Sequence, residues 1–162
     1  MQARAASRED AEVIARIYNE GIEERIATFE TRPRTAKEIR AWFDDGYPVI
    51  LVEEEGVVIS FANTSAYSTR ECYSGVAEFS VYTARESRGR GAGTLAMEAL
   101  ILAAEKAGFW KLVSRVFVEN ELSRKLLFSL GFREVGVHER HARLDGFWRD
   151  VVVVERLIPA NL

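Results

Sequence analysis

The chain is poor in the side chains that form crosslinks or bind metals. It has one cysteine, Cys72, and two histidines, His138 and His141, among 162 residues. A single cysteine excludes an internal disulfide and is typical of a reducing compartment. The histidines stand three positions apart in a strand-like segment, where side chains at i and i+3 face opposite sides. We therefore expect no metal site, although such spacing occurs among metal ligands.

Long apolar runs and an excess of positive charge are also absent. No stretch approaches the roughly 20 residues that cross a bilayer as a helix, and residues 1–10 lack the apolar segment of a signal peptide. The 22 Lys and Arg residues are outnumbered by 25 Asp and Glu residues, so no basic field favours nucleic acid or an anionic membrane. We expect a cytoplasmic protein that binds neither.

What the chain does contain is enough apolar sequence for a hydrophobic core. Hydrophobic residues make up 48% of it, and no long linker interrupts it, so we expect one domain over residues 1–162. The expected strands cover 2–6, 49–53, 57–67, 76–83, 112–118, 131–143 and 148–157; the expected helices follow Ser7 and Thr35, begin at Gly91, and run from 121 to 130. Gly21 is expected to end the first helix. The order β-α-α-β-β-β-α-β-α-β-β predicts an α+β fold: a mixed, mostly antiparallel sheet of about seven strands flanked by about four helices.

The segment Arg88-Gly89-Arg90-Gly91-Ala92-Gly93-Thr94, here called the glycine loop, carries the clearest chemical signal. It joins an expected strand to an expected helix, where open backbone amides and the helix dipole favour an anion such as a pyrophosphate. A tight turn with surface arginines is the alternative. The loop lacks the Lys of a P-loop after Gly93, and a dinucleotide motif starting at Gly89 would need glycine at Thr94.

Read as Arg-x-x-Gly-x-Gly, the loop resembles the acetyl-coenzyme A motif of the GNAT superfamily of N-acetyltransferases. Asn120, Ser123 and the segment Leu130-Gly131-Phe132 are similar to the second coenzyme A segment of that superfamily. The resemblance implies a GNAT fold and acetyl-CoA as co-substrate. The implied acetyl-CoA-binding residues are Val81, Tyr82, Thr83, Arg88, Gly89, Arg90, Gly91, Ala92, Gly93, Thr94, Asn120 and Ser123.

Finer features resemble one branch, the phosphinothricin acetyltransferases. They include 28–31, Arg70, Tyr73, Ala77-Glu78 and Gly146-x-Trp148-x-Asp150, and the segment 141–151 is similar to arsinothricin N-acetyltransferases of arsenic-resistance operons. The resemblance implies acetylation of the α-amino group of a small glutamate-like amino acid antibiotic, which confers resistance. It places Phe29, Arg70, Tyr73 and Glu78 at the substrate.

The same resemblance implies a homodimer, for which Phe147, Trp148 and the run 151–154 offer apolar material; a buried core strand is the other interpretation of that run. Other activities stay open at this point. The chain could acetylate methionine sulfone, methionine sulfoximine or another small amine, or it could be a non-catalytic acyl-CoA sensor.

Acetyl transfer to an amine needs a base, and the strand 76–83 offers one. Period-two alternation puts Glu78, Ser80 and Tyr82 on one face. Because Glu78 is a carboxylate among apolar neighbours, it is suited to act as the base. The matching Glu has this role in the family that the chain resembles. The alternative is that Glu78 is a charged residue on a solvated strand face. Leu127 stands where many superfamily members carry Tyr and phosphinothricin enzymes carry His. Because leucine cannot donate a proton, Tyr82, water or the helix N-terminus must stabilise the departing thiolate.

Overall fold

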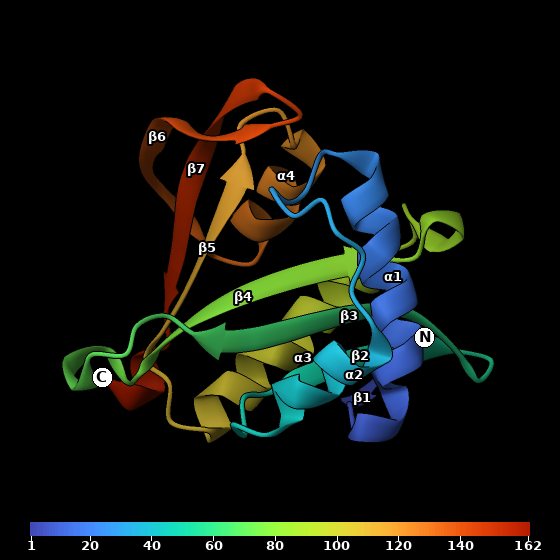
Figure 1. The fold of residues 1–162 in the computed structure, drawn as a ribbon. Coiled ribbons are helices and arrows are strands. Elements are labelled where there is room, and N and C mark those ends of the chain that lie inside the picture. Colours follow the sequence, from blue (N-terminus) through green and yellow to red (C-terminus); the bar gives the residue numbers. More distant parts are fainter.

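A computed structural model describes all 162 residues, and its seven strands form one mixed sheet in the order β1-β2-β3-β4-β5-β7-β6 (Figure 1). Only the neighbours β4 and β5 are parallel. The strands are β1 (Gln2–Ala5), β2 (Val49–Glu54), β3 (Val57–Ala66), β4 (Val76–Thr83), β5 (Lys111–Phe117), β6 (Arg133–Leu144) and β7 (Phe147–Leu157). The helices are α1 (Ala11–Glu24), α2 (Ala36–Arg40), α3 (Ala92–Lys106) and α4 (Glu121–Ser129). The predicted α+β class and element order are confirmed.

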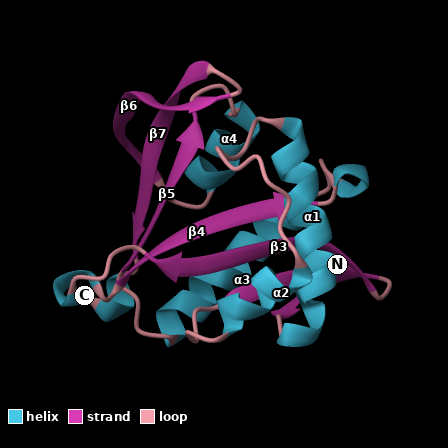
Figure 2. Cartoon of the chain, viewed as in Figure 1, coloured by secondary structure: helices cyan, strands magenta, loops and turns pink.

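Helices cover both faces of the sheet, and strand alternation divides the core between them (Figure 2). In β2, Ile50 and Val52 pack in the cluster that contains Met97 and Leu100 of α3. The intervening Leu51 packs instead with residues of α1 and α2. Successive strand residues point to opposite faces, so one strand serves both clusters. None of the helices combines the length and the hydrophobicity that a membrane-spanning helix requires.

The first helix does not end at Gly21, as the sequence predicted. It continues to Glu24 and ends at Arg25, which adopts the left-handed conformation with φ 58°. Gly21 is buried inside the helix, where a Cβ would lie 2.7 Å from ring atoms of Tyr82. The glycine therefore marks a close approach between α1 and β4 rather than a helix terminus.

The predicted hairpin turns are confirmed by their backbone angles. Glu55 and Gly56 join β2 to β3 with φ 52° and 79°, and Asp145 and Gly146 join β6 to β7 with φ 50° and 84°. In β7, the valines at 151, 152 and 154 are buried. That run is therefore part of the core, and the side chains left exposed at this end of β7 are those of Phe147 and Trp148.

The expectation that His138 and His141 face opposite sides is wrong. The pairing of β6 with β7 shifts between His138 and Ala142, and Arg140 within this bulge has φ 47°. The bulge interrupts the two-residue period, so the two imidazole rings lie 4.6 Å apart, edge to face. No group of three or more His, Cys, Asp or Glu side chains has an arrangement that could hold a metal ion.

Candidate active site

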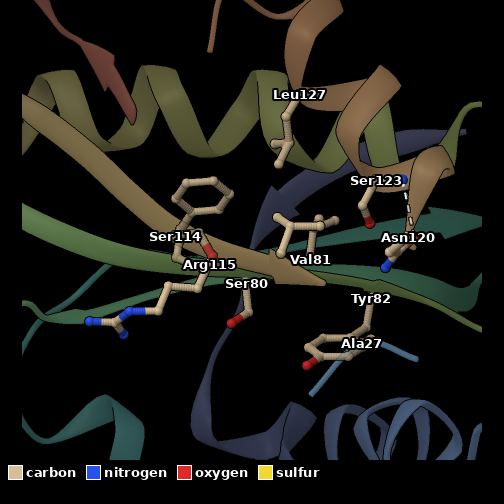
Figure 3. A pocket seen from close by; sticks show the side chains of 11 residues that line it. Ala27, Ser80, Val81, Tyr82, Ser114, Arg115, Asn120, Ser123 and Leu127 are labelled. Atoms are coloured by element: carbon tan, nitrogen blue, oxygen red, sulfur yellow. Dashed lines mark hydrogen bonds between the residues drawn. The ribbon is translucent and has the colours of Figure 1, made fainter. Parts of the chain in front are cut away.

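The site lies where the parallel strands β4 and β5 separate. Their pairing covers three residue pairs and ends at Glu78 and Val113. Beyond that point β5 continues along β7 and diverges from β4 (Figure 1), and residues of both strands and of α4 line an opening between them (Figure 3). A pocket fills this opening, and its lining comprises Ala27, Phe79, Ser80, Val81, Tyr82, Ser114, Arg115, Val116, Asn120, Ser123 and Leu127.

The side chains of β4 divide this pocket into two sides (Figure 3). Val81 points toward Leu127 of α4, whereas Ser80 and Tyr82 point to the opposite side of the strand. Leu127 is 2% exposed and belongs to the core cluster of α3 and the sheet. This buried leucine packs the pocket wall and supplies no proton.

Tyr82 is held rigidly on the α1 side. Its ring lies 5.1 Å from that of Tyr18 and 5.5 Å from that of Phe61, and it covers Gly21. Burial raises the pKa of the Tyr82 phenol above its ordinary value, and Tyr18 adds to the shift while the hydroxyl of Thr28 opposes it. The phenol is therefore protonated at neutral pH and can act only as a neutral donor or acceptor.

Asn120 and Ser123 open α4 at the pocket. The Asn120 side chain accepts a hydrogen bond from the Ser123 backbone N–H at 3.3 Å, which caps the helix (Figure 3). Its amide nitrogen donates to the Ile26 carbonyl at 3.5 Å, which links α4 to the segment after α1. Asn120 thus positions Ser123, whose hydroxyl faces the pocket without a partner in the chain.

The glycine loop has the geometry of an anion cradle. Gly91 precedes α3 with φ 88°, and no side chain caps this helix. The first backbone bond of α3 runs from Leu95 to the Gly91 carbonyl, so the N–H groups of 92–94 point out of the helix end without intrahelical partners. A Cβ on Gly93 would lie 3.3 Å from both Thr83 Oγ1 and Leu126. Glycine at position 93 therefore allows the loop to lie close to β4. The free N–H groups of residues 92–94 are the kind of donors that suit a pyrophosphate.

The two arginines of the loop pair with carboxylates of the chain. Arg88 donates to both oxygens of Glu24 at 2.5 and 2.6 Å and to the Thr83 carbonyl at 3.1 Å. Arg90 lies 2.6 Å from Glu54. The Arg88 guanidinium holds the pKa of the Glu24 carboxyl below its usual value. Both side chains therefore tie the loop to α1 and β2, and the outward-facing donors of the loop are its backbone amides.

Glu78 lies at the base of the opening and contacts a residue that the sequence analysis missed. Arg115 Nη1 lies 3.4 Å from Glu78 Oε1. The same alternation that placed Glu78, Ser80 and Tyr82 on one face also places Val113 and Arg115 on that face of β5. This signal was in the sequence, but only the pairing of β4 with β5 shows that the two side chains meet.

The predicted substrate residues are spread along the strands. Phe29 packs edge to face against Phe117, at the carboxyl end of β5, with ring centroids 4.8 Å apart. Arg70 and Tyr73 lie in the exposed β3–β4 loop, beside the start of β4, and Arg70 forms no ion pair. Lys111 pairs with the first residue of β4, and Phe117 follows it by six positions, about 20 Å of strand. Glu78 lies between these two ends, nearer the Arg70 loop.

Comparison with known proteins agrees with this geometry. Residues 14–132 match the Acetyltransferase (GNAT) family. The chain belongs to this family. The GNAT chain is 30% identical to the phosphinothricin N-acetyltransferase of Streptomyces coelicolor, over 96% of this chain and 95% of that protein. It is 28% identical to the L-methionine sulfoximine/L-methionine sulfone acetyltransferase of Salmonella typhimurium, over 96% and 93%.

Solved structures show the same fold around the donor. A phosphinothricin acetyltransferase from Sinorhizobium meliloti, in complex with acetyl-CoA, superposes with a TM-score of 0.90 and 28% sequence identity, covering 97% of this chain and 88% of that one. From its family and its relatives, this GNAT chain is an acetyltransferase. In this chain the α3 N-terminus has no side-chain cap, β4 has an unpaired edge beyond Glu78, and Asn120 caps α4.

Proposed function

We propose that this GNAT acetyltransferase transfers the acetyl group of acetyl-CoA to the α-amino group of a small glutamate-like amino acid antibiotic, phosphinothricin or arsinothricin, and so confers resistance. The observation that carries the proposal is the position of Glu78. This carboxylate lies at the last pair of the β4–β5 ladder, and its partner Arg115 lines the pocket that Asn120 and Ser123 also border. Relatives named for phosphinothricin and methionine sulfoximine support an amino acid acceptor.

In this proposal the glycine loop and α4 bind the donor. The amides of residues 92–94 bind the pyrophosphate, with Gly89, Gly91 and Gly93 giving close access. The donor supplies a thioester carbonyl next to the unpaired edge of β4, at Val81 to Thr83. Asn120 and Ser123 border the same pocket from α4.

Glu78 then accepts the proton of the acceptor ammonium, directly or through water. Leu127 supplies no proton, so the departing thiolate takes one from the neutral Tyr82 phenol or from water, or is stabilised by the α3 N-terminus. Arg70 and Tyr73 recognise the second anionic group of the acceptor, and Phe29 contributes an apolar wall.

Two other functions compete with this one. The similarity to a methionine sulfoximine/methionine sulfone acetyltransferase favours those amino acids or another small amine as the acceptor. The buried Leu127 at the position of the usual proton donor favours a non-catalytic acyl-CoA sensor. A sensor would bind acetyl-CoA and release no thiol with any amine.

We also propose a homodimer in which the exposed Phe147 and Trp148 take part. These side chains are 75% and 52% exposed, and the guanidinium of Arg143 covers the Trp148 ring at 4.4 Å. Light scattering coupled to gel filtration tests this proposal. The proposal would be contradicted if the wild-type protein had the molar mass of a monomer at micromolar concentration and the Trp148→Ala variant had the same mass.

Thiol release from acetyl-CoA tests the acceptor. The panel comprises arsinothricin, phosphinothricin, methionine sulfoximine, methionine sulfone and a peptide with a free N-terminus. We expect the highest kcat/KM with the first two, because they carry a second anionic group for Arg70. Highest kcat/KM with methionine sulfoximine would favour the second function, and acetyl-CoA binding without any thiol release would favour the sensor.

A further inference from the structure

Arg115 and Glu78 form a contact between opposite charges at the point where β4 and β5 separate. Val113 is the last residue of β5 to pair with β4, and its partner is Glu78. Arg115 stands two residues further along β5 and so points from the same face. Its Nη1 lies 3.4 Å from Glu78 Oε1. Arg115 is thus the basic side chain next to the proposed base.

The guanidinium of Arg115 makes little use of its donors within the chain. A single N–H group donates to Glu78, the contact is long, and the guanidinium makes no other hydrogen bond or ion pair. Arg124, by contrast, donates to both oxygens of Glu134 at 2.8 and 2.9 Å. The Arg115 side chain is 48% exposed and lines the pocket (Figure 3). It therefore retains the planar fork that binds a carboxylate through two parallel hydrogen bonds.

A free amino acid has the charges that match this pair. Its α-ammonium and α-carboxylate are attached to the same carbon, so their complement is an anion and a cation in contact. The ammonium then lies beside Glu78 and the carboxylate beside Arg115. Binding exchanges one long contact between partly exposed groups for charge-assisted contacts on both sides. The exchange also returns both oxygens of Glu78 to the amine that must lose a proton.

We propose that Arg115 binds the α-carboxylate of the acceptor and thereby selects free amino acids over amines that lack this group. The inference rests on the proposed function, because it needs an amino acid as the acceptor. Arg70, at the end of the site nearer Glu78, is then left for the second anionic group. When the amine has no α-carboxylate, Arg115 stays in contact with Glu78, and no anion binds beside Arg115 in the pocket.

The test compares phosphinothricin and methionine sulfoximine with their α-carboxamides, which keep the amine but lose the anion. We expect the wild-type protein to prefer each free acid by about 100-fold in kcat/KM. Arg115→Gln should lower kcat/KM for the free acids by about 100-fold, mainly through KM, and change that of the carboxamides less than about threefold. The preference for the free acid should disappear, and Arg115→Lys should retain part of it because it keeps the charge without the fork.

Controls separate this role from a structural one. Arg8→Gln removes an arginine that pairs with Asp44 on another part of the surface and should leave the preference unchanged. Thermal melting and acetyl-CoA affinity should not differ between Arg115→Gln and wild type. An Arg115→Gln variant that keeps the preference for free acids would overturn the proposal, as would an active wild-type protein without such a preference. Wild-type protein that binds acetyl-CoA but acetylates no amino acid would instead refute the proposed function, and this inference with it.

Discussion

The ring of Tyr82 occupies the space that a side chain at Gly21 would need. A Cβ at position 21 would lie 2.7 Å from Cδ1 and Cε1 of Tyr82. Gly21 belongs to α1 and Tyr82 to β4, the strand that lines the pocket. This contact therefore sets how closely α1 approaches the site and holds Tyr82 on the face that also bears Glu78.

We expect Gly21→Ala to destabilise the protein even though alanine is the better helix former. Alanine gains about 1 kcal/mol over glycine in a helix interior, whereas overpacking a filled core costs about 1–3 kcal/mol. Tyr18 and Phe61 flank the Tyr82 ring, so it cannot move aside freely. Urea denaturation measures the free energy of unfolding. In a Tyr82→Ala background the same change should stabilise by about 1 kcal/mol, and an effect of equal sign in both backgrounds would contradict this account.

Glu78→Gln should lower kcat by about 10²–10⁴-fold, the usual contribution of a general base. The amide keeps the size of the side chain but cannot accept a proton. Acetyl-CoA affinity should not change, because Glu78 is not part of the donor site. The matched control is Glu98→Gln, an exposed carboxylate on α3 without an ion pair. Full turnover by Glu78→Gln between mildly acidic and neutral pH would exclude Glu78 as the base.

Gly91→Ala should weaken acetyl-CoA binding by about tenfold, or about 1.4 kcal/mol. Position 91 has φ 88°, where a Cβ costs roughly 1–2 kcal/mol, and relief of this strain would turn the amides of the α3 N-terminus. Gly46→Ala is the matched control, because Gly46 also has positive φ, 73°, and open space around it. Both variants should lose stability, but only Gly91→Ala should raise the Kd of acetyl-CoA in calorimetry. Equal Kd values in the two variants would argue against this anion site.

Leu127→Met should retain kcat within about threefold, since a swap that conserves volume costs less than about 1.5 kcal/mol. Leu127 is 2% exposed, so Leu127→Ala should lower the free energy of unfolding by about 2–5 kcal/mol. Steady-state kinetics and denaturant unfolding of the two variants check these values. Loss of turnover in Leu127→Met at unchanged stability would show that leucine does more than pack.

The pair between Glu24 and Arg88 should make stability depend on pH. The pKa of Glu24 is lowered in the folded protein, chiefly by its hydrogen bonds to Arg88. A lowered pKa contributes stability above the unfolded-state value, about 4, and this contribution is lost as pH falls through the folded-state value. Glu24→Gln should therefore lower Tm at pH 7, and the difference from wild type should shrink steadily below about pH 4. A difference that stays constant down to pH 2 would show that Arg88 does not stabilise the charged form.

Much of the fold could be predicted because its signals are local. The range predicted for β4, 76–83, agrees with the structure, and the Glu55-Gly56 and Asp145-Gly146 turns lie where they were expected. Thr35 caps α2 by accepting a hydrogen bond from the Glu38 N–H, as its spacing predicted. Hydrophobic periodicity, helix caps and turn residues depend on residues only a few positions apart, so these signals can be identified in a single sequence.

Part of the candidate site was predictable for the same reason. The glycine-rich turn before α3 and the face shared by Glu78, Ser80 and Tyr82 both depend on spacing within a short stretch of chain. The interpretation of Gly21 failed because this glycine makes room for the distant Tyr82 ring and does not mark a helix end. The histidine pair was misjudged because a bulge in β6 interrupts the alternation, and nothing in the residues themselves marked it.

The sequence by itself determined the order of strands and helices and the glycine-rich turn before α3, and it places an apolar side chain, Leu127, where the family resemblance implies a proton donor. Only the tertiary structure decided which distant side chains meet: Arg88 with Glu24, Gly21 with Tyr82, and Arg115 with Glu78. Residues separated by 37 to 64 positions become neighbours through strand pairing and helix packing. That is why the residue next to the proposed base could not be predicted from spacing along the chain.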